Sequence, residues 1–280
     1  MRVVAAHAIK ESLRRRVFAV VLVLSVVFLG LYAWGTSELF DDVSGFSSNE
    51  FGVDAETLAG ATVLGLAMFA ILFLGAVLST FLTLGAVRGD AERGLLQPLI
   101  VRPLGRTSYL GGRLLAAAAV SAAYVVVLFG ACTVITGLLG WWPDRWIAPA
   151  LGLAGAAAII AAISLLGSVL LSSTANGIAV FMVFGAGLVA GLLGQIGEAL
   201  NSDTLDTIAD IATWILPFEA LYQDGLAQLT ADVDGATEAI VTLGPFGGAQ
   251  EAGAGMWPFA IAYVVAVFAA AAALFARRDL

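Results

Sequence analysis

The sequence predicts an all-α membrane protein with six transmembrane helices. Of its 280 residues, 60% are hydrophobic and only 12% are charged, and the mean hydropathy is +0.97, which is typical of a polytopic membrane protein. The apolar residues gather in six long uncharged runs, each near the ~20 residues that cross a bilayer as a helix. The charges are segregated between these runs. With six spans there is no room for a large soluble domain, so residues 1–280 are expected to form one transmembrane domain.

The six apolar runs are the expected transmembrane helices. The second run is the longest and must tilt or extend beyond the bilayer, because it exceeds the ~20 residues that a span requires. Three tryptophans follow the third run and mark a membrane interface. Residues Ser172–Asn176 are expected to form a tight turn between the fourth and fifth runs. The runs cover residues 17–35, 58–87, 114–140, 147–171, 177–194 and 256–276.

The basic residues predict the orientation of the chain. All lysines and arginines except Arg145 lie before the first run, within residues 88–113, or after the last run. The acidic segments 36–57 and 195–255 contain no lysine or arginine. Because basic residues favour the cytoplasmic side of a bilayer, both termini and residues 88–113 are expected in the cytoplasm. The expected location is the cell (cytoplasmic) membrane.

Residues 195–255 are expected to form external amphipathic helices before the last span. Apolar residues recur there at helical spacing, and an aromatic cluster follows them. A helix with one apolar face lies on the outer leaflet or dips into it. The glycines beyond residue 230 indicate a looser loop. The apolar stripe consists of Ile196, Leu200, Leu205, Ile208, Ala212 and Ile215, and the cluster of Trp214, Pro217, Phe218 and Tyr222.

Residues 2–16 form a basic helix candidate before the first span. Ile9 and Leu13 can face one side of this helix, and Lys10 and residues 14–16 the other. This pattern predicts a helix in the membrane interface. The alternative is a basic anchor that only fixes the orientation of the chain.

Residues 88–113, with the sequence RGDAERGLLQPLIVRPLGRTSYLGGR, are the most distinctive stretch of the chain. Leu95, Leu96, Leu99 and Ile100 recur there at helical spacing, while prolines divide the segment into short pieces. The segment is too apolar for a solvated turn, so we expect a short cytoplasmic helix that presses against a partner. The alternative is a basic loop that contacts only lipid headgroups.

The residue types needed for chemistry within the chain are missing. The six runs contain none of the ionisable residues on which ion-coupled carriers and pumps depend. The chain has no GxxxxGK[ST] phosphate-binding loop, so it is not expected to bind ATP itself. His7 is the only histidine, and Cys132 is the only cysteine and is expected to be a packing residue. No catalytic, cofactor or metal site is therefore expected, and the chain is not expected to be an enzyme.

These features resemble the ABC-2-type exporter permeases, in particular the six-span branch that includes the nitrous-oxide-reductase maturation permease (NosY-like). That family carries an acid, a glycine, a hydrophobic pair and then a proline with a basic residue after its second span. Here the match runs through Glu92, Arg93, Gly94, Leu95, Leu96, Leu99, Arg102, Pro103 and Arg106. The resemblance implies that these residues, together with Asp90, contact the ATPase. Lys10, Glu11 and Arg16 resemble the family's interfacial elbow helix. The acidic segment before the last span is similar to the family's external helices.

The resemblance implies a permease subunit whose energy comes from another chain. ATP and Mg would bind to a separate cytoplasmic ATP-binding subunit, and residues 88–113 would be the coupling segment that docks on it. Two permeases, as a homodimer or a heterodimer, would sit on two ATPases. Close packing of Gly65, Gly75, Gly185 and Gly187, on the second and fifth spans, is one hypothesis for the permease interface. The expected surroundings are lipid, and no nucleic-acid partner is expected.

Two other functions remain open from the sequence. A membrane anchor or assembly factor for the maturation of an extracytoplasmic complex would have the same six spans without direct transport. A secondary carrier is disfavoured by the uncharged spans and by the lack of a visible half-to-half repeat. The transported substrate is not identified by the sequence.

Overall fold

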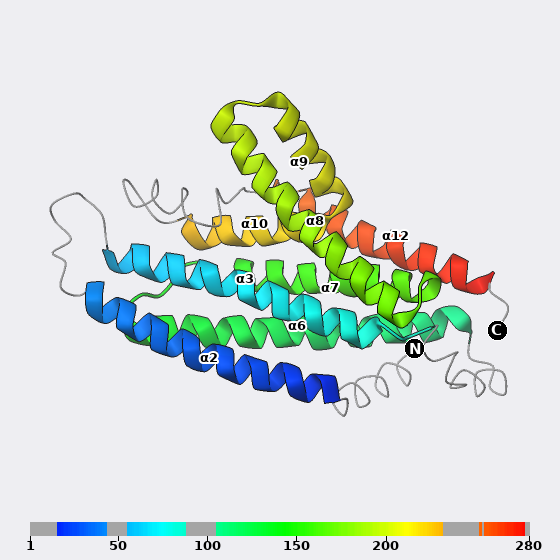
Figure 1. Cartoon of the computed structure of the whole chain (residues 1–280), viewed down its shortest axis with the longest axis horizontal. Helices are drawn as coiled ribbons and strands as arrows, with labels where there is room; N and C mark the ends of the chain where they lie inside the picture. The colour runs from blue at the N-terminus through cyan, green and yellow to red at the C-terminus, as the bar shows by residue number, and fades with distance from the viewer. Residues whose placement is uncertain (1–15, 44–54, 88–104, 232–251, 254, 278–280) are drawn as a thin grey trace.

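The computed structural model describes residues 16–43, 55–87, 105–231, 252–253 and 255–277. This part of the chain is helical and contains no strand, which confirms the predicted fold class (Figure 1). The helices are α2 (Arg16–Val43), α3 (Ala55–Thr83), α6 (Arg106–Leu139), α7 (Ile147–Leu170), α8 (Ser173–Leu200), α9 (Asp203–Ile215), α10 (Pro217–Thr230) and α12 (Met256–Ala276).

Six of these helices are long and apolar enough to cross a membrane, as the sequence predicts. They are α2, α3, α6, α7, α8 and α12. Several of the helices extend beyond the predicted spans. The third span was expected from Leu114, but α6 begins at Arg106, and Arg113 is buried within it. The turn expected over Ser172–Asn176 is shorter, because the Asn176 N–H already donates to the Ser172 carbonyl at 2.8 Å in the first turn of α8.

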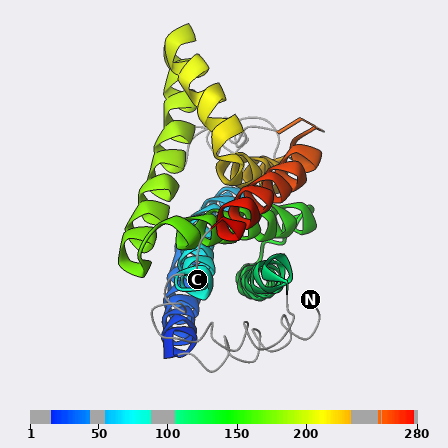
Figure 2. The ribbon, with the colours of Figure 1, turned by 90° about the vertical axis from the view of Figure 1, so that its right-hand side faces the viewer.

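The helices pack in tiers around α3 and α7. In Figure 1, α10 and α12 lie on one side of this central pair, and α2 and α6 lie on the other. Figure 2 shows the same order from the end of the bundle. The spans α3 and α7 are the most buried of the six, while α2 and α12 are the least. The second half of α8 rises with α9 away from the other helices (Figure 1).

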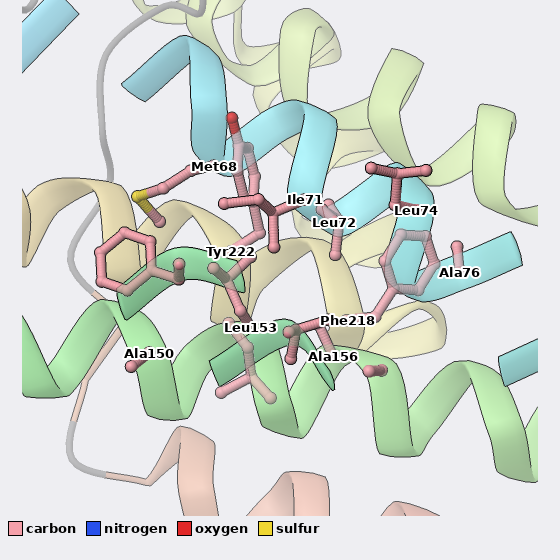
Figure 3. Close-up of a cluster of buried hydrophobic side chains, with 14 of the residues drawn as sticks. Met68, Ile71, Leu72, Leu74, Ala76, Ala150, Leu153, Ala156, Phe218 and Tyr222 are labelled. Atoms are coloured by element: carbon pink, nitrogen blue, oxygen red, sulfur yellow. The ribbon is translucent and has the colours of Figure 1, made fainter. Parts of the chain in front are cut away.

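The core divides into two hydrophobic clusters. The larger one joins α3, α7 and α10 and includes Ile71, Leu153 and Phe218 (Figure 3). The Phe218 ring also stacks on Phe184 of α8, with ring centroids 5.5 Å apart. The smaller cluster joins the ends of α3, α6, α7 and α12. Thus the short helix α10 belongs to the main core, although it is not long enough to cross a bilayer.

Two glycines permit the close approach of α10 and α7. A Cβ atom at Gly152 would lie 2.6 Å from the Leu221 carbonyl oxygen, and one at Gly225 would lie 3.2 Å from the Pro149 Cα. Small residues let helix backbones approach in this way. The two helices expected between the fifth and sixth spans are therefore present, but they differ. The α9 residues Ile208 and Ile211 are exposed, whereas one face of α10 is buried.

Candidate functional site

Most residues predicted to dock on an ATPase lie outside the described residues. These are Asp90, Glu92, Arg93, Gly94, Leu95, Leu96, Leu99, Arg102 and Pro103, together with Lys10 and Glu11 of the predicted elbow. Arg16 is the first residue of α2, and Arg106 is the first residue of α6. The structure describes the two helical ends that flank this segment, which are the end of α3 with residues 84–87 and the start of α6.

The two flanks of residues 88–104 belong to one packed unit. The Tyr109 hydroxyl on α6 donates to the Ala86 carbonyl at 2.9 Å, and the Arg113 Nε donates to that hydroxyl at 3.2 Å. The Arg113 guanidinium carbon also lies 5.6 Å from the centroid of the Tyr109 ring, within the range of a cation–π contact. Val87 and Leu110 are buried in the same hydrophobic cluster. We call this unit, Ala86–Val87 with Arg106–Arg113, the loop base.

Arg106 connects the loop base to the last span. Its Nη1 donates to the carbonyls of Phe275 at 3.3 Å and Ala276 at 3.1 Å. Its guanidinium carbon lies 5.8 Å from the centroid of the Phe275 ring. The last carbonyls of a helix lack partners within the helix and attract a positive charge. The Arg106 guanidinium, expected to contact the partner subunit, thus lies against the end of α12.

A polar pocket lies at the other end of α12. Its volume is about 390 Å³. Inside it, the Gln223 Nε2 donates to the Glu219 Oε1 at 2.8 Å. Glu219 is 5% exposed and Gln223 is 8% exposed, and the Gln223 Oε1 has no hydrogen-bond partner among the described residues. The lining comprises Asp210, Thr213, Trp214, Glu219, Ala220, Gln223, Ala252, Gly253, Gly255 and Met256.

The Glu219 carboxyl is held in an apolar setting. A Cβ atom at Gly191 of α8 would overlap the Glu219 Oε1, so the absence of a side chain there makes room for the carboxyl. Burial raises the pKa of Glu219 to about 7, and the hydrogen bond from Gln223 opposes this shift. The pKa of the neighbouring Tyr222 is raised by burial and then by the negative charge of Glu219. A carboxyl of this kind changes its charge near neutral pH.

This pocket was missed in the sequence. Glu219 was one of ten acids in residues 195–255, and Tyr222 belonged to an aromatic cluster that was expected to face a membrane surface. A signal was present in the spacing. Glu219 and Gln223 are four residues apart and therefore share a face of α10, while Phe218 before them and Leu221 between them are apolar. A polar pair that shares a helix face and has bulky apolar neighbours indicates a candidate for a buried polar site.

A groove of about 570 Å³ runs between the second and fifth spans, α3 and α8. Phe81, Ile178 and Met182 are exposed on it. Beside it, the Asn176 Nδ2 of α8 donates to the Ser164 carbonyl of α7 at 2.9 Å, so this bond connects two helices. The lining comprises Thr80, Phe81, Leu84, Ser173, Thr174, Gly177, Ile178, Phe181 and Met182.

The four glycines proposed for a dimer interface have different surroundings in the structure. Gly65 faces Leu226, Gly75 faces Val125 and Gly187 faces Phe218, so these three serve packing within the chain. Gly185 has no atom within 4 Å of the position of an added Cβ. Gly185 is therefore the member of the set that is open to another molecule.

The six long apolar helices define a multi-pass helical membrane protein. The family model of the ABC-2 family transporter protein matches residues 2–280. The chain belongs to this family, which makes it a membrane transport component of an ABC transporter whose family works with a separate ABC ATPase. A search of curated proteins found no match. Among the described residues, no group of three His, Cys, Asp or Glu residues is placed to hold a metal ion.

Proposed function

We propose that this protein is the permease subunit of an ABC exporter in the cell membrane. It moves its substrate by using ATP that a separate cytoplasmic ATPase subunit hydrolyses. The observation that carries the proposal is the loop base, because a segment that receives force must be anchored to the helices that move. Resemblance to the NosY-like branch supports export as the direction, and the distribution of basic residues supports cytoplasmic termini.

The coupling element in this proposal is residues 88–104 together with the loop base. Leu95, Leu96 and Leu99 supply an apolar face, and burial of one leucine contributes about 1.5–3 kcal/mol. Glu92 and Arg102 would set the register of the contact through charge complementarity. Displacement of this element would act on α3 and α6 through Tyr109, and on α12 through the bonds that Arg106 donates.

The transport path in this proposal lies where two permeases meet across α3 and α8. Exposed apolar side chains on both helices, including Phe73 and Met182, support this assignment. Gly185 supports it as well, since it allows close approach from outside the chain. A bulky substitution, Gly185→Leu, is expected to reduce dimer assembly or transport. Gly130→Leu on α6, where no atom lies within 4 Å of an added Cβ, is the matched control.

The test uses the full-length permease purified with its ATPase partner. Leu95→Ala combined with Leu96→Ala removes part of the proposed docking face and should weaken retention of the ATPase by at least about tenfold, since 1.4 kcal/mol corresponds to a factor of ten. The matched control is Leu115→Ala with Leu138→Ala, two exposed leucines of α6. Full retention of the ATPase and full substrate-stimulated ATP hydrolysis in the Leu95/Leu96 variant would overturn the coupling assignment.

A further inference from the structure

We propose that the pocket between α9, α10 and the start of α12 is a binding site for an organic cation with N–H donors, such as a primary ammonium or guanidinium group on a small apolar body. The proposal concerns binding alone. It depends neither on the direction of transport nor on the identity of the ATPase.

The first argument is the pattern of hydrogen-bonding groups. One hydrogen bond joins the Gln223 Nε2 to the Glu219 Oε1 at 2.8 Å. This uses one of the two N–H donors of the amide and leaves the Gln223 Oε1 without a partner among the described residues, although the side chain is more than nine-tenths buried. Buried acceptors without partners are rare and destabilising. The pocket therefore presents acceptors, and a ligand that fits it must bring donors.

The second argument is charge. Both ionisable residues in the lining, Asp210 and Glu219, are acidic, and residues 195–255 contain no lysine, arginine or histidine. A buried carboxylate is costly unless a cation pairs with it. An ammonium or guanidinium group would supply that charge and N–H donors for the Gln223 Oε1 at once.

The third argument is the shape and chemistry of the remaining lining. Trp214 and Met256 supply apolar surface beside the two acids. The Trp214 ring is held edge-on against Phe259, with ring centroids 4.7 Å apart. An indole ring attracts cations through its face. The volume of about 390 Å³ suits a small molecule with one charged end and an apolar body.

Proton exchange at Glu219 provides a signature for such binding. The pKa of this carboxyl is about 7 because it is buried. Asp210 of α9 lines the same pocket, Tyr222 lies one turn away on α10, and Asp224 accepts a hydrogen bond from the Ala252 N–H at 3.1 Å. Since the cation requires the ionised form, binding should tighten as the pH rises through 7 and level off above it.

The experiment is calorimetric titration of phenethylammonium into the full-length protein in phosphatidylcholine nanodiscs, with empty nanodiscs as the blank. Two related compounds separate the contributions: phenethyl alcohol lacks the charge, and phenethyltrimethylammonium lacks the N–H donors. We expect saturable binding of the primary ammonium at pH 8, about tenfold weaker binding at pH 6, and at least tenfold weaker binding of both related compounds.

Variants test the named residues. Glu219→Gln keeps the size and the bond to Gln223 and should weaken binding at least tenfold, as should Gln223→Leu. Glu38→Gln on α2, outside the pocket, is the matched control and should leave affinity unchanged. Equal binding by Glu219→Gln, or no saturable binding by the unaltered protein at pH 8, would overturn the proposal. If the variants do not fold, equal affinity for phenethyl alcohol would overturn it by itself.

Discussion

The loop base and the α10 pocket are two polar regions near opposite ends of α12, and their hydrogen bonding differs. At the loop base the arginines have hydrogen-bond acceptors: Arg106 donates to two carbonyls of α12, and Arg113 donates to Tyr109. In the pocket an acidic residue is buried with an amide acceptor that lacks a partner among the described residues. One helix joins the two regions, since α12 begins with Met256 in the pocket and ends with the carbonyls that Arg106 contacts.

This difference suggests two kinds of role. A polar region whose side chains are hydrogen-bonded to neighbouring helices is suited to transmitting force, because separating the helices breaks those hydrogen bonds. A buried polar region with unpartnered hydrogen-bond acceptors is suited to binding, because a ligand can supply the hydrogen-bond donors that the protein does not. The two regions are about 30 Å apart, which is the length of a 21-residue helix at ~1.5 Å per residue.

The largest expected loss of stability comes from a substitution that forces α10 away from α7. Gly152→Leu places a side chain against the Leu221 carbonyl, which would lie 2.6 Å from the new Cβ. A backbone carbonyl cannot change its position as readily as a flexible side chain can. We therefore expect the free energy of unfolding to fall by about 2–4 kcal/mol, or the protein not to fold. Gly130→Leu is the control, because its Cβ would meet no atom within 4 Å. Thermal unfolding in detergent measures both, and equal melting temperatures would contradict the packing of α10.

The second effect is the pH dependence that Glu219 imposes on stability. Its pKa is about 7 in the folded protein and 4.5 when unperturbed. The folded state therefore holds the proton more tightly, and stability falls as the pH rises from about 4.5 through 7, by roughly 3 kcal/mol in total. Glu219→Gln should unfold at a higher temperature than the unaltered protein at pH 8, and at nearly the same temperature at pH 4.5. A difference that does not vary with pH would contradict a buried, ionising Glu219.

The third effect concerns the link from the loop base to α12. Arg106→Gln removes a positive charge from the end of the helix, together with its contact to the Phe275 ring. We expect the free energy of unfolding to fall by about 1–2 kcal/mol. We also expect faster amide hydrogen exchange in the last turn of α12. Arg277→Gln, an exposed neighbour of the same charge, is the control. Unchanged exchange in the Arg106 variant would show that the link is not formed.

The smallest effect tests the bond across the loop base. Tyr109→Phe removes the hydroxyl that donates to the Ala86 carbonyl and accepts from Arg113. The free energy of unfolding is expected to fall by about 1 kcal/mol, because both hydrogen bonds are only part-buried and lie near the lower end of the usual contribution. Tyr263→Phe on α12 serves as the control, and chemical unfolding at equal protein concentration compares the two. A larger loss at Tyr263 would contradict the assignment of the loop base.

The sequence was sufficient for the spans because length and apolarity alone determine them. The sequence was insufficient where tertiary contacts determine whether a polar side chain is buried. Arg113 was placed outside the third span because it is charged, yet its bond to Tyr109 allows it to lie buried within α6. The pocket was missed for a similar reason. The spacing of Glu219 and Gln223 was the local signal, but only the enclosure by Gly191 and α12 separates Glu219 from the nine other acids of its segment.

The most direct test of the proposed function is cross-linking from the segment that the loop base anchors. In a Cys132→Ala background, Leu96→Cys and Asp42→Cys would each be labelled with a photoactivatable cross-linker in membranes that contain the ATPase subunit. Asp42 lies near the end of α2, beyond the opposite end of the bundle from the loop base (Figure 1). The proposal predicts a cross-link to the ATPase from position 96, changed by ATP, and none from position 42. A cross-link from position 42 with none from position 96 would contradict it.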